Sequence, residues 1–425
     1  MQPSSSVNSL PSAAAIPPLS PPRGALLAIF LVVLVDMLGF GLVVPLLPIY
    51  ARQFHASAFE VTLLFSLFSI FQFIGSPLLG MASDRIGRRP VLFASQMVTC
   101  VAYALLAWTT GRSWAVPALG LGMIYLSRIV AGLGGGNIAT ASAYISDVTT
   151  TENRARGMGM LGAAFGIGFS IGPAVGGMLA HYVSPSAPAW LAMGMAGISA
   201  ILAGLLIPNS PRRATGDTAL WLHPARFKPL FANRPLMRIN LAWFIAMGAF
   251  VAMDSAVVMF LLDVFGYKER QVAYYFLLVG MVIIITQGGL VGRLNDWLGE
   301  WTMCIAGLIL VAVGASVVGC TSWRAATAVL VIGAIIHAFG RSLFQPTIAA
   351  LVSQHSDPAE QGLSYGFFQG VGALARAAGP LGAGVLYSLH HSLPWFVGAL
   401  FLTLTGIWLG SVRRGERKLS AECVQ

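Results

Sequence analysis

Long apolar stretches separated by short polar linkers dominate the pattern of this chain. A helix needs about 20 predominantly apolar residues to cross the hydrocarbon core of a bilayer. The pattern predicts an all-α integral membrane protein with twelve transmembrane helices, which we expect at 25–51, 60–82, 91–110, 114–145, 156–182, 188–207, 237–262, 270–294, 301–320, 325–350, 362–388 and 394–411.

The composition supports this prediction and excludes several classes of protein. Of the 425 residues, 56% are hydrophobic and 9% are charged, whereas a soluble domain carries about 25% charged residues. A soluble enzyme, a disulfide-stapled secreted domain and a disordered regulator are therefore excluded. The four cysteines have no metal-ligand spacing, so we expect free thiols, no metal and no cofactor.

One longer linker, 208–236, divides the spans into two sets of six. We expect an N-terminal six-helix bundle at 24–207 and a C-terminal six-helix bundle at 237–411. Residues 1–23 are rich in Pro, Ser and Ala, which predicts a disordered cytoplasmic tail rather than a signal peptide. A second cytoplasmic tail is expected at 412–425.

The basic residues set the expected orientation. With the N-terminus in the cytoplasm, most of the 25 lysines and arginines fall in cytoplasmic segments, as the positive-inside rule requires. Both termini and the 208–236 linker are then cytoplasmic. The net charge of +10 follows from topology, so we expect the lipid bilayer and no nucleic acid as a partner.

The second half of the chain echoes the first. The segment Gly80-Met-Ala-Ser-Asp84-Arg-Ile-Gly87 is matched by Gly292-Arg-Leu-Asn-Asp296-Trp-Leu-Gly299. Three more matches lie in corresponding helices: Asp36 with Asp254, Arg128 with Arg341, and Gly172-Pro173 with Gly379-Pro380. Two six-helix repeats are predicted, and an even number of helices leaves them parallel.

These residues resemble motifs of the major facilitator superfamily. Gly80–Pro90 looks like its cytoplasmic loop signature, and Leu126–Asn137 with Asp147 looks like its helix 4 signature. The glycines around Pro173 resemble the helix 5 signature of drug/proton antiporters. Asp36–Pro48 resembles helix 1 of the tetracycline/proton antiporter group. The resemblance implies the major facilitator fold and alternating access by two bundles around a midplane site.

The loop signature implies a gate. A carboxylate beside arginines can form a charge-assisted network. In the family that this chain resembles, such a network latches the outward-facing state. A membrane anchor is the alternative, but it does not explain Asp84 or the glycines. The copy at Asp296 lacks the matching arginines, which predicts a weaker latch. The residues expected to gate are Gly80, Asp84, Arg85, Gly87, Arg88, Arg89 and Asp147.

Two ionisable residues are expected near mid-bilayer, where charge is costly and usually functional. Asp36 lies roughly 16 Å into helix 1, a depth that suits a proton carrier; structural pairing with an arginine is the alternative. Arg128 keeps its charge, and the resemblance ties the matching arginine to proton coupling. We expect Arg128 to pair with Asp36, or alternatively to hydrogen-bond backbone carbonyls.

The helix 5 glycines leave two interpretations open. Gly168, Gly172, Gly176 and Gly177 remove side chains from the helix, and Pro173 kinks it. Tight helix packing and a hinge or seal between the halves both fit, because close packing is how a seal works. The second copy at Gly379-Pro380 has its other glycines shifted and is a weaker match.

Polar and aromatic residues inside the spans are candidates for a substrate cavity. Three intramembrane arginines against two central acids predict a positive potential, which favours an anionic or zwitterionic substrate. Asp263 is expected to lie solvated at the outer boundary. The cavity candidates are Phe40, Gln72, Asn137, Asp254, Gln287, Arg341, Gln345, Gln369 and Arg376; helix packing is the alternative for each amide.

The sequence departs from the tetracycline exporters that it resembles. Where they carry a helix 3 acid this chain has Ala102, and their helix 8 histidine falls near Ile283. Tetracycline itself is therefore not the expected substrate. The pattern Gly157-Met-Gly159-Met-Leu-Gly162 lacks the preceding strand of a dinucleotide site and is not interpreted as one.

We predict a monomeric secondary transporter of a bacterial inner membrane, in which protons drive the export of a small amphipathic drug or metabolite. A proton symporter or facilitator that imports a metabolite is the alternative on the same fold. A non-transporting receptor or scaffold is a further alternative. A membrane-embedded enzyme is disfavoured because the sequence shows no catalytic constellation.

Overall fold

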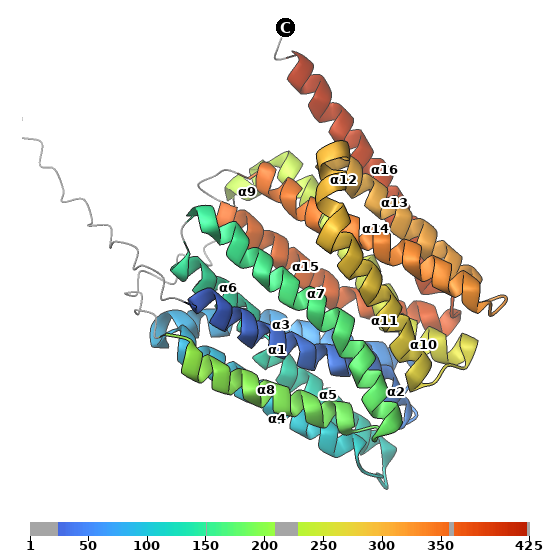
Figure 1. The fold of residues 1–425 in the computed structure, drawn as a ribbon. Helices are drawn as coiled ribbons and strands as arrows, with labels where there is room; N and C mark the ends of the chain where they lie inside the picture. The colour runs from blue at the N-terminus through green and yellow to red at the C-terminus, as the bar shows by residue number, and fades with distance from the viewer. Residues whose placement is uncertain (1–23, 150, 209–227, 357–360, 423–425) are drawn as a thin grey trace, which may run out of the picture.

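The computed structural model describes residues 24–149, 151–208, 228–356 and 361–422, and nearly all of them are helical (Figure 1). The expected tail at 1–23 and the centre of the 208–236 linker lie outside these ranges. Within the described part of that linker, a short helix, α9 (Lys228–Ala232), precedes the seventh span.

The N-terminal half consists of six spans; the first and fourth are interrupted, and the second, third and fifth extend beyond the predicted ranges. Its elements are α1 (Ala25–Val43), η1 (Val44–Leu46), α2 (Leu47–Arg52), α3 (Ala58–Ile86), α4 (Arg88–Thr110), α5 (Pro117–Gly134), α6 (Asn137–Val148), α7 (Thr151–Tyr182) and α8 (Ala187–Leu206).

The C-terminal half repeats this arrangement. Its elements are α10 (Arg234–Phe265), α11 (Glu269–Ile285), η4 (Thr286–Leu290), α12 (Val291–Leu298), α13 (Glu300–Cys320), α14 (Thr327–Gln354), α15 (Gln361–Leu389) and α16 (Leu393–Glu422). Eleven helical stretches in the described residues are long and apolar enough to cross a membrane. α15 is as long but carries Gln369 and Arg376, which lower its hydropathy. The predicted fold class is confirmed.

Several helix ends follow from local sequence. Ser57 caps α3 in a capping box with Glu60, whose carboxylate accepts a hydrogen bond from the Ser57 amide at 2.8 Å. Gly87 separates α3 from α4 at φ +102°, and Gly299 separates α12 from α13 at φ +72°. Both positions require glycine because other residues avoid such angles. The two halves therefore have the same glycine turn between their second and third spans.

The last helix corrects one expected boundary. The predicted span ends at 411, but α16 continues to Glu422 and extends beyond the bundle (Figure 1). Residues 412–422 of the expected tail are thus helical. The basic residues that end the hydropathy pattern do not stop a helix, because Arg and Lys are good helix formers.

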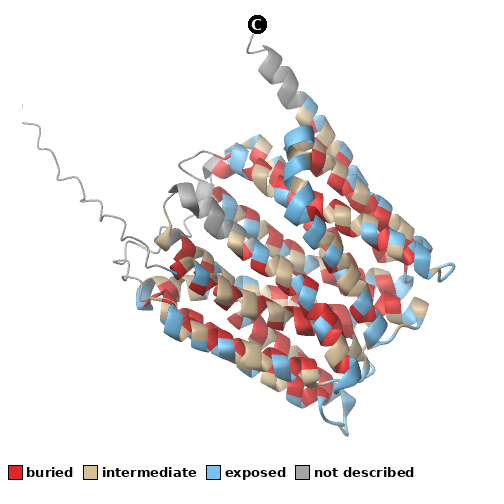
Figure 2. Cartoon of the chain, viewed as in Figure 1, coloured by how far each residue is buried: buried red, intermediate tan, exposed pale blue. Residues whose placement is uncertain are grey.

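The outer surface of the helices is apolar. Many large side chains are exposed, among them Leu205 (74%), Ile407 (65%) and Ile285 (64%). Figure 2 shows exposed residues on the outer faces of the helices and buried residues between them. Exposed apolar patches on this scale belong in lipid. The chain is a multi-pass membrane protein.

Glycines set the packing of α7 against α1. A Cβ on Gly172 would lie 2.6 Å from backbone atoms of Gly41, and one on Gly168 would lie 2.6 Å from the backbone of Met37. A Cβ on Gly176 would lie 2.3 Å from the Leu42 carbonyl oxygen. Three glycines of the antiporter-like motif therefore serve packing inside the N-terminal half, where small residues permit close helix contact.

The fourth glycine of the motif contacts the other half. A Cβ on Gly177 would lie 2.5 Å from the Cβ of Ala273 on α11. About two helical turns earlier on α7, Ser170 Oγ donates a hydrogen bond to the Gly280 carbonyl of α11 at 3.2 Å. One helix thus combines both interpretations of the motif: packing against α1 and contact between the halves.

We predict that Gly172→Ala destabilises the protein, whereas Gly166→Ala on the same helix does not. The first methyl overlaps the α1 backbone, and overpacking of this kind costs about 1–3 kcal/mol. Gly166 has open space around it, and Ala in a helix is favoured over Gly by about 1 kcal/mol. Thermal unfolding of both variants in detergent measures the difference; equal stability would contradict the proposed backbone contact.

Candidate functional site

A buried polar cluster surrounds Asp36 in the N-terminal half. Asn137 Nδ2 donates a hydrogen bond to Asp36 Oδ2 at 2.8 Å, and the two residues are 4% and 7% exposed. Gln96 on α4 lies within interaction range of the same carboxyl group. Neither the Gln96 amide nor Asn137 Oδ1 has a hydrogen-bond partner among the described residues. The cluster therefore has unused donors and acceptors, which suit a bound water or a transferred proton.

Arg128 lies buried on α5 but does not pair with Asp36. Its guanidinium lies 4.7 Å from the ring centroid of Phe68, and its Nε has no hydrogen-bond partner. Tyr103 lies within electrostatic range of both Asp36 and Arg128. The expected ion pair between Asp36 and Arg128 is therefore wrong. Asn137 hydrogen-bonds the Asp36 carboxylate, and the Arg128 guanidinium lies over the ring of Phe68.

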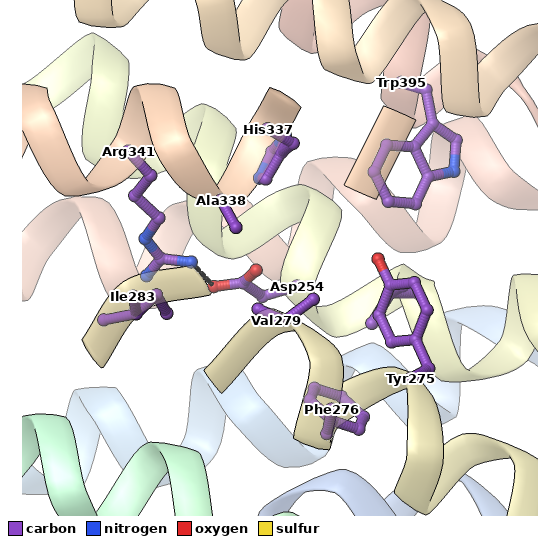
Figure 3. Close-up of a pocket in the computed structure, with 10 residues that line it drawn as sticks. Asp254, Tyr275, Phe276, Val279, Ile283, His337, Ala338, Arg341 and Trp395 are labelled. Carbon is purple, nitrogen blue, oxygen red and sulfur yellow. Dashed lines mark hydrogen bonds and ion pairs between the residues drawn. The ribbon is translucent and has the colours of Figure 1, made fainter. Parts of the chain in front are cut away.

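The matching residues of the C-terminal half do form an ion pair. Arg341 Nη1 donates to Asp254 Oδ2 at 2.6 Å, joining α14 to α10. The pair lies in a pocket with aromatic walls that include Tyr275, Phe276 and Trp395 (Figure 3). The two halves therefore carry an acid and an arginine at corresponding positions, but among the described residues only Asp254 and Arg341 form an ion pair.

The expected gating network forms around Arg88, which is 5% exposed. Its guanidinium bonds Asp84 at 2.7 Å, Asp147 at 3.0 Å and the Ser83 hydroxyl. These contacts join α3, α4 and α6 within the N-terminal half. Arg85 is exposed and Arg89 half-buried. In the second copy, Asn295 instead donates to Glu300 at 3.3 Å, and Asp296 is exposed.

A second charge network joins the two halves at the opposite end. Arg52 on α2 binds Asp263 on α10 through both carboxylate oxygens, with Nη2 at 2.6 Å from Oδ2. Tyr387 on α15 donates to the same carboxylate at 2.7 Å. The expected solvated position of Asp263 is therefore wrong: its side chain is 24% exposed and bridges the repeats.

The halves touch near this bridge and separate toward the Asp84 loop. At the Arg52 end, a Cβ on Gly384 would overlap Thr62 Oγ1 of the other half. A Cβ added at any of six glycines on helices of the two halves would meet no atom within 4 Å: Gly80, Gly166, Gly288, Gly289, Gly366 and Gly370. α7 and α11 accordingly lie side by side at one end and apart at the other (Figure 1).

The remaining cavity candidates are placed in different surroundings. Phe40 lies between Phe68 and Phe169, with ring centroids 5.2 and 5.6 Å away. Gln72 donates to the Gly135 carbonyl at 3.0 Å, which is a helix-packing contact. Arg376 is half-buried, and three other amides are exposed: Gln287, Gln345 and Gln369.

Sequence reasoning missed several polar residues of these clusters. Gln96 and Tyr103 approach Asp36 from α4, and His337 lines the Asp254 pocket from α14. Hydropathy gave no signal for them, since single polar residues are common in apolar spans. Arg52 and Tyr387 lie at helix ends, where polar residues need no special explanation.

Comparison with known proteins identifies the family. The model of the Major Facilitator Superfamily matches residues 29–380 and 302–422. The chain is 30% identical to the class C tetracycline resistance protein of Escherichia coli, covering 92% of this chain and 97% of the relative. It is 27% identical to human major facilitator superfamily domain-containing protein 10, with 92% of each chain covered.

Solved structures share the fold. The crystal structure of the human organic anion transporter MFSD10 (TETRAN) has a TM-score of 0.67 at 24% identity and covers 91% of this chain and 99% of that one. A D-xylose-proton symporter has a TM-score of 0.74 at 15% identity, covering 91% and 97%. The two parallel six-helix repeats define a transporter. The chain belongs to the Major Facilitator Superfamily.

We predict that Arg88→Ala impairs transport far more than Arg85→Ala. Removing Arg88 takes their shared partner from Asp84 and Asp147, and a hydrogen bond to a charged group contributes about 1.5–3 kcal/mol. Arg85 is exposed, so its removal costs about 1 kcal/mol or less. Transport rates normalised to membrane protein level compare the two variants; equal loss would favour a simple positive-inside anchor.

We predict that Arg52→Asp opens the Arg52 end of the interface and that the exchanged pair Arg52→Asp/Asp263→Arg closes it again. Like charges replace a bidentate pair in the single variant, and an effect of about 1 kcal/mol changes a two-state ratio about fivefold. Labelling of Thr62→Cys by a membrane-impermeant maleimide, in a cysteine-free background, reports the opening. Unchanged labelling in the single variant would show that the bridge does not hold the halves together.

Proposed function

We propose that this protein is a proton-coupled antiporter that exports a small amphipathic drug or metabolite by alternating access. It acts as a monomer in a bacterial inner membrane with both termini in the cytoplasm. The proton carrier is Asp36. The observation that carries the proposal is the position of its carboxyl group, buried in mid-span within a polar cluster that has unused hydrogen-bonding groups.

Proton exchange at Asp36 has a physical basis in that cluster. A buried carboxylate without a cationic partner is costly, and protonation removes the charge. Asn137 and Gln96 each have both a donor and an acceptor group, so either can serve the charged or the neutral carboxyl form. Arg128, held against Phe68, supplies a fixed positive charge in the same half. Its movement toward Asp36 would favour release of the proton.

The arrangement of the halves supports substrate loading from the cytoplasm. In the orientation given by the positive-inside rule, the Arg52–Asp263 bridge closes the outer end and the Asp84 end faces the cytoplasm. An exporter takes up its substrate in this state. Rocking of the two halves would break the bridge, separate Gly177 from Ala273 and close the Asp84 end.

The charges within the spans support an anionic or zwitterionic substrate. Arg128 and Arg376 have no ion pair among the described residues, and Arg341 is neutralised by Asp254. An excess of fixed positive charge attracts a negative group from water. The name of the class C tetracycline resistance protein favours a drug as cargo.

We predict that Asp36→Asn abolishes proton-coupled exchange. The amide preserves size and hydrogen bonding to Asn137 but takes up no proton. Purified protein in liposomes containing a pH-sensitive dye should move protons opposite to substrate, and the variant should fall to the level of protein-free vesicles. Asp296→Asn, which removes an exposed carboxylate, is the matched control.

The direction of the proton signal separates the candidate functions. Protons that move with the substrate would establish a symporter and overturn export by exchange. Substrate movement without protons, equal in wild type and Asp36→Asn, would leave a facilitator with a structural Asp36. Wild-type coupling in Asp36→Asn would place the proton on another residue.

A further inference from the structure

A row of buried polar side chains continues from Asp36 toward the cytoplasmic end of the N-terminal half. Asn137, Thr140 and Tyr144 follow one another on α6 at intervals of three and four residues, which places them on one face of the helix. They are 4%, 0% and 1% exposed. The row begins where Asn137 donates to Asp36 at 2.8 Å, covers about 10 Å of the helix axis, and ends within one turn of Asp147 in the gating network.

The polar atoms of this row lack partners. The hydroxyl groups of Thr140 and Tyr144 and the Oδ1 atom of Asn137 have no hydrogen-bond partner among the described residues. The same holds for the side-chain amide of Gln96, which approaches Asp36 from α4. Buried polar groups are nearly always hydrogen-bonded, either to protein or to ordered water. A buried water molecule makes about three hydrogen bonds, and this row offers several donors and acceptors in succession.

The surroundings of the row are apolar. Tyr144 lies in a core cluster of the N-terminal half together with Ile29 and Val33 of α1, Leu92 of α4 and Leu161 of α7. These side chains offer no hydrogen bonds, so water in this place has to bond to the row and to neighbouring water. The apolar cluster therefore favours a chain of water molecules along the polar face of α6.

The other titratable or charged groups near Asp36 lie on its outer side. Tyr103 follows Gln96 by seven residues on α4, which runs from the cytoplasmic to the outer end, and Arg128 precedes Asn137 by nine residues. At a rise of 1.5 Å per residue, both backbone positions lie about 10 Å or more nearer the outer end. A fixed positive charge repels an approaching proton, so the side of Asp36 away from Arg128 is the favourable one.

We propose that Gln96, Asn137, Thr140 and Tyr144 hold a chain of water molecules through which Asp36 exchanges its proton with the cytoplasm while the Asp84 end is open. The inference rests on the proposed function, because it takes Asp36 as the proton carrier. On release, the O–H bond of the carboxyl group breaks and the proton joins the first water molecule, which passes one of its own protons to the next. A carboxylate remains, and one proton reaches the cytoplasm; uptake is the reverse.

This route separates the proton from the substrate. With the Asp84 end open, the space between the halves is where a substrate enters from the cytoplasm. A route inside the N-terminal half lets the proton leave while the substrate occupies that space. Substrate loading and proton release then take place on the same side of the membrane without competing for one path.

The test measures hydrogen–deuterium exchange at Asp36 by infrared spectroscopy of the full-length protein in detergent. Arg52→Cys and Asp263→Cys, joined by a short bifunctional methanethiosulfonate in a cysteine-free background, keep the outer end closed. The C=O band of the protonated carboxyl group is assigned to Asp36 by its absence in Asp36→Asn. This band shifts when the proton is replaced by a deuteron, so its rate of shift after transfer into D2O measures the exchange.

We expect Tyr144→Phe and Thr140→Val each to slow deuteration of Asp36 by about tenfold or more, since a positioned proton-transfer group typically contributes about 10²–10⁴ in rate. Thr140→Ser keeps the hydroxyl group and should exchange like the wild type. Tyr50→Phe is the matched control, because it removes another buried hydroxyl group without a partner from the same half. It should leave the rate unchanged.

The water molecules have a spectroscopic signature of their own. Difference spectra between acidic and alkaline buffer should contain bands of hydrogen-bonded water that shift in water labelled with oxygen-18. The wild type and Thr140→Ser should show these bands, and Thr140→Val and Tyr144→Phe should lose part of them. A purely structural role of the two hydroxyl groups would change neither these bands nor the exchange rate.

Wild-type exchange rates in both Thr140→Val and Tyr144→Phe would overturn the proposal and show that Asp36 reaches water between the halves. Slowing in Tyr103→Phe alone would also overturn it, because the proton would then leave on the outer side. Absence of an Asp36 carboxyl band from the wild type at every pH would reject Asp36 as the proton carrier. Slowed exchange in the two variants, with no proton movement in liposomes, would reject the antiport and leave the water path standing.

Discussion

The close approach of α7 to α1 is the contact on which the rest of the arrangement depends. Backbone meets backbone where Gly41 faces Gly168 and Gly172, a distance that no side chain allows. Asp36 lies on α1 next to this contact, so its depth and direction follow from the glycines. The same α7 continues to Gly177, where it contacts α11 of the other half. A single helix thus connects the candidate proton site with the interface that must change in alternating access.

The two halves use the same residue types in different ways. In the N-terminal half, Asn137 holds Asp36, and Arg128 lies against Phe68 without an acid. In the C-terminal half, Arg341 and Asp254 form a partly exposed pair. A repeated acid and arginine therefore give one buried carboxyl group held by an amide and one partly exposed ion pair. Neighbouring aromatic and amide side chains, rather than the charged residues themselves, account for the difference.

The charge networks at the two ends of the protein have different reach. The Arg88 network joins helices of one half only, and it forms where the halves have separated. The bridge from Arg52 to Asp263 and Tyr387 spans both halves, and it forms where they touch. The side chains of Arg52 and Asp263 are 32% and 24% exposed, so water can solvate both charges when the two halves separate there.

The sequence by itself determined the fold class, the spans and the internal repeat, because a bilayer requires long apolar helices and the repeated motifs follow in order along the chain. It also predicted Asp36 and Arg128 as buried charges, since their depth follows from position in a helix. Only the tertiary structure decided which charges pair. Asp36 accepts a hydrogen bond from Asn137 and does not pair with Arg128. Asp263 forms an ion pair with Arg52 across the interface between the halves. Pairing depends on how helices rotate and cross, and glycine contacts between distant segments set that geometry without leaving a periodic signal in the sequence.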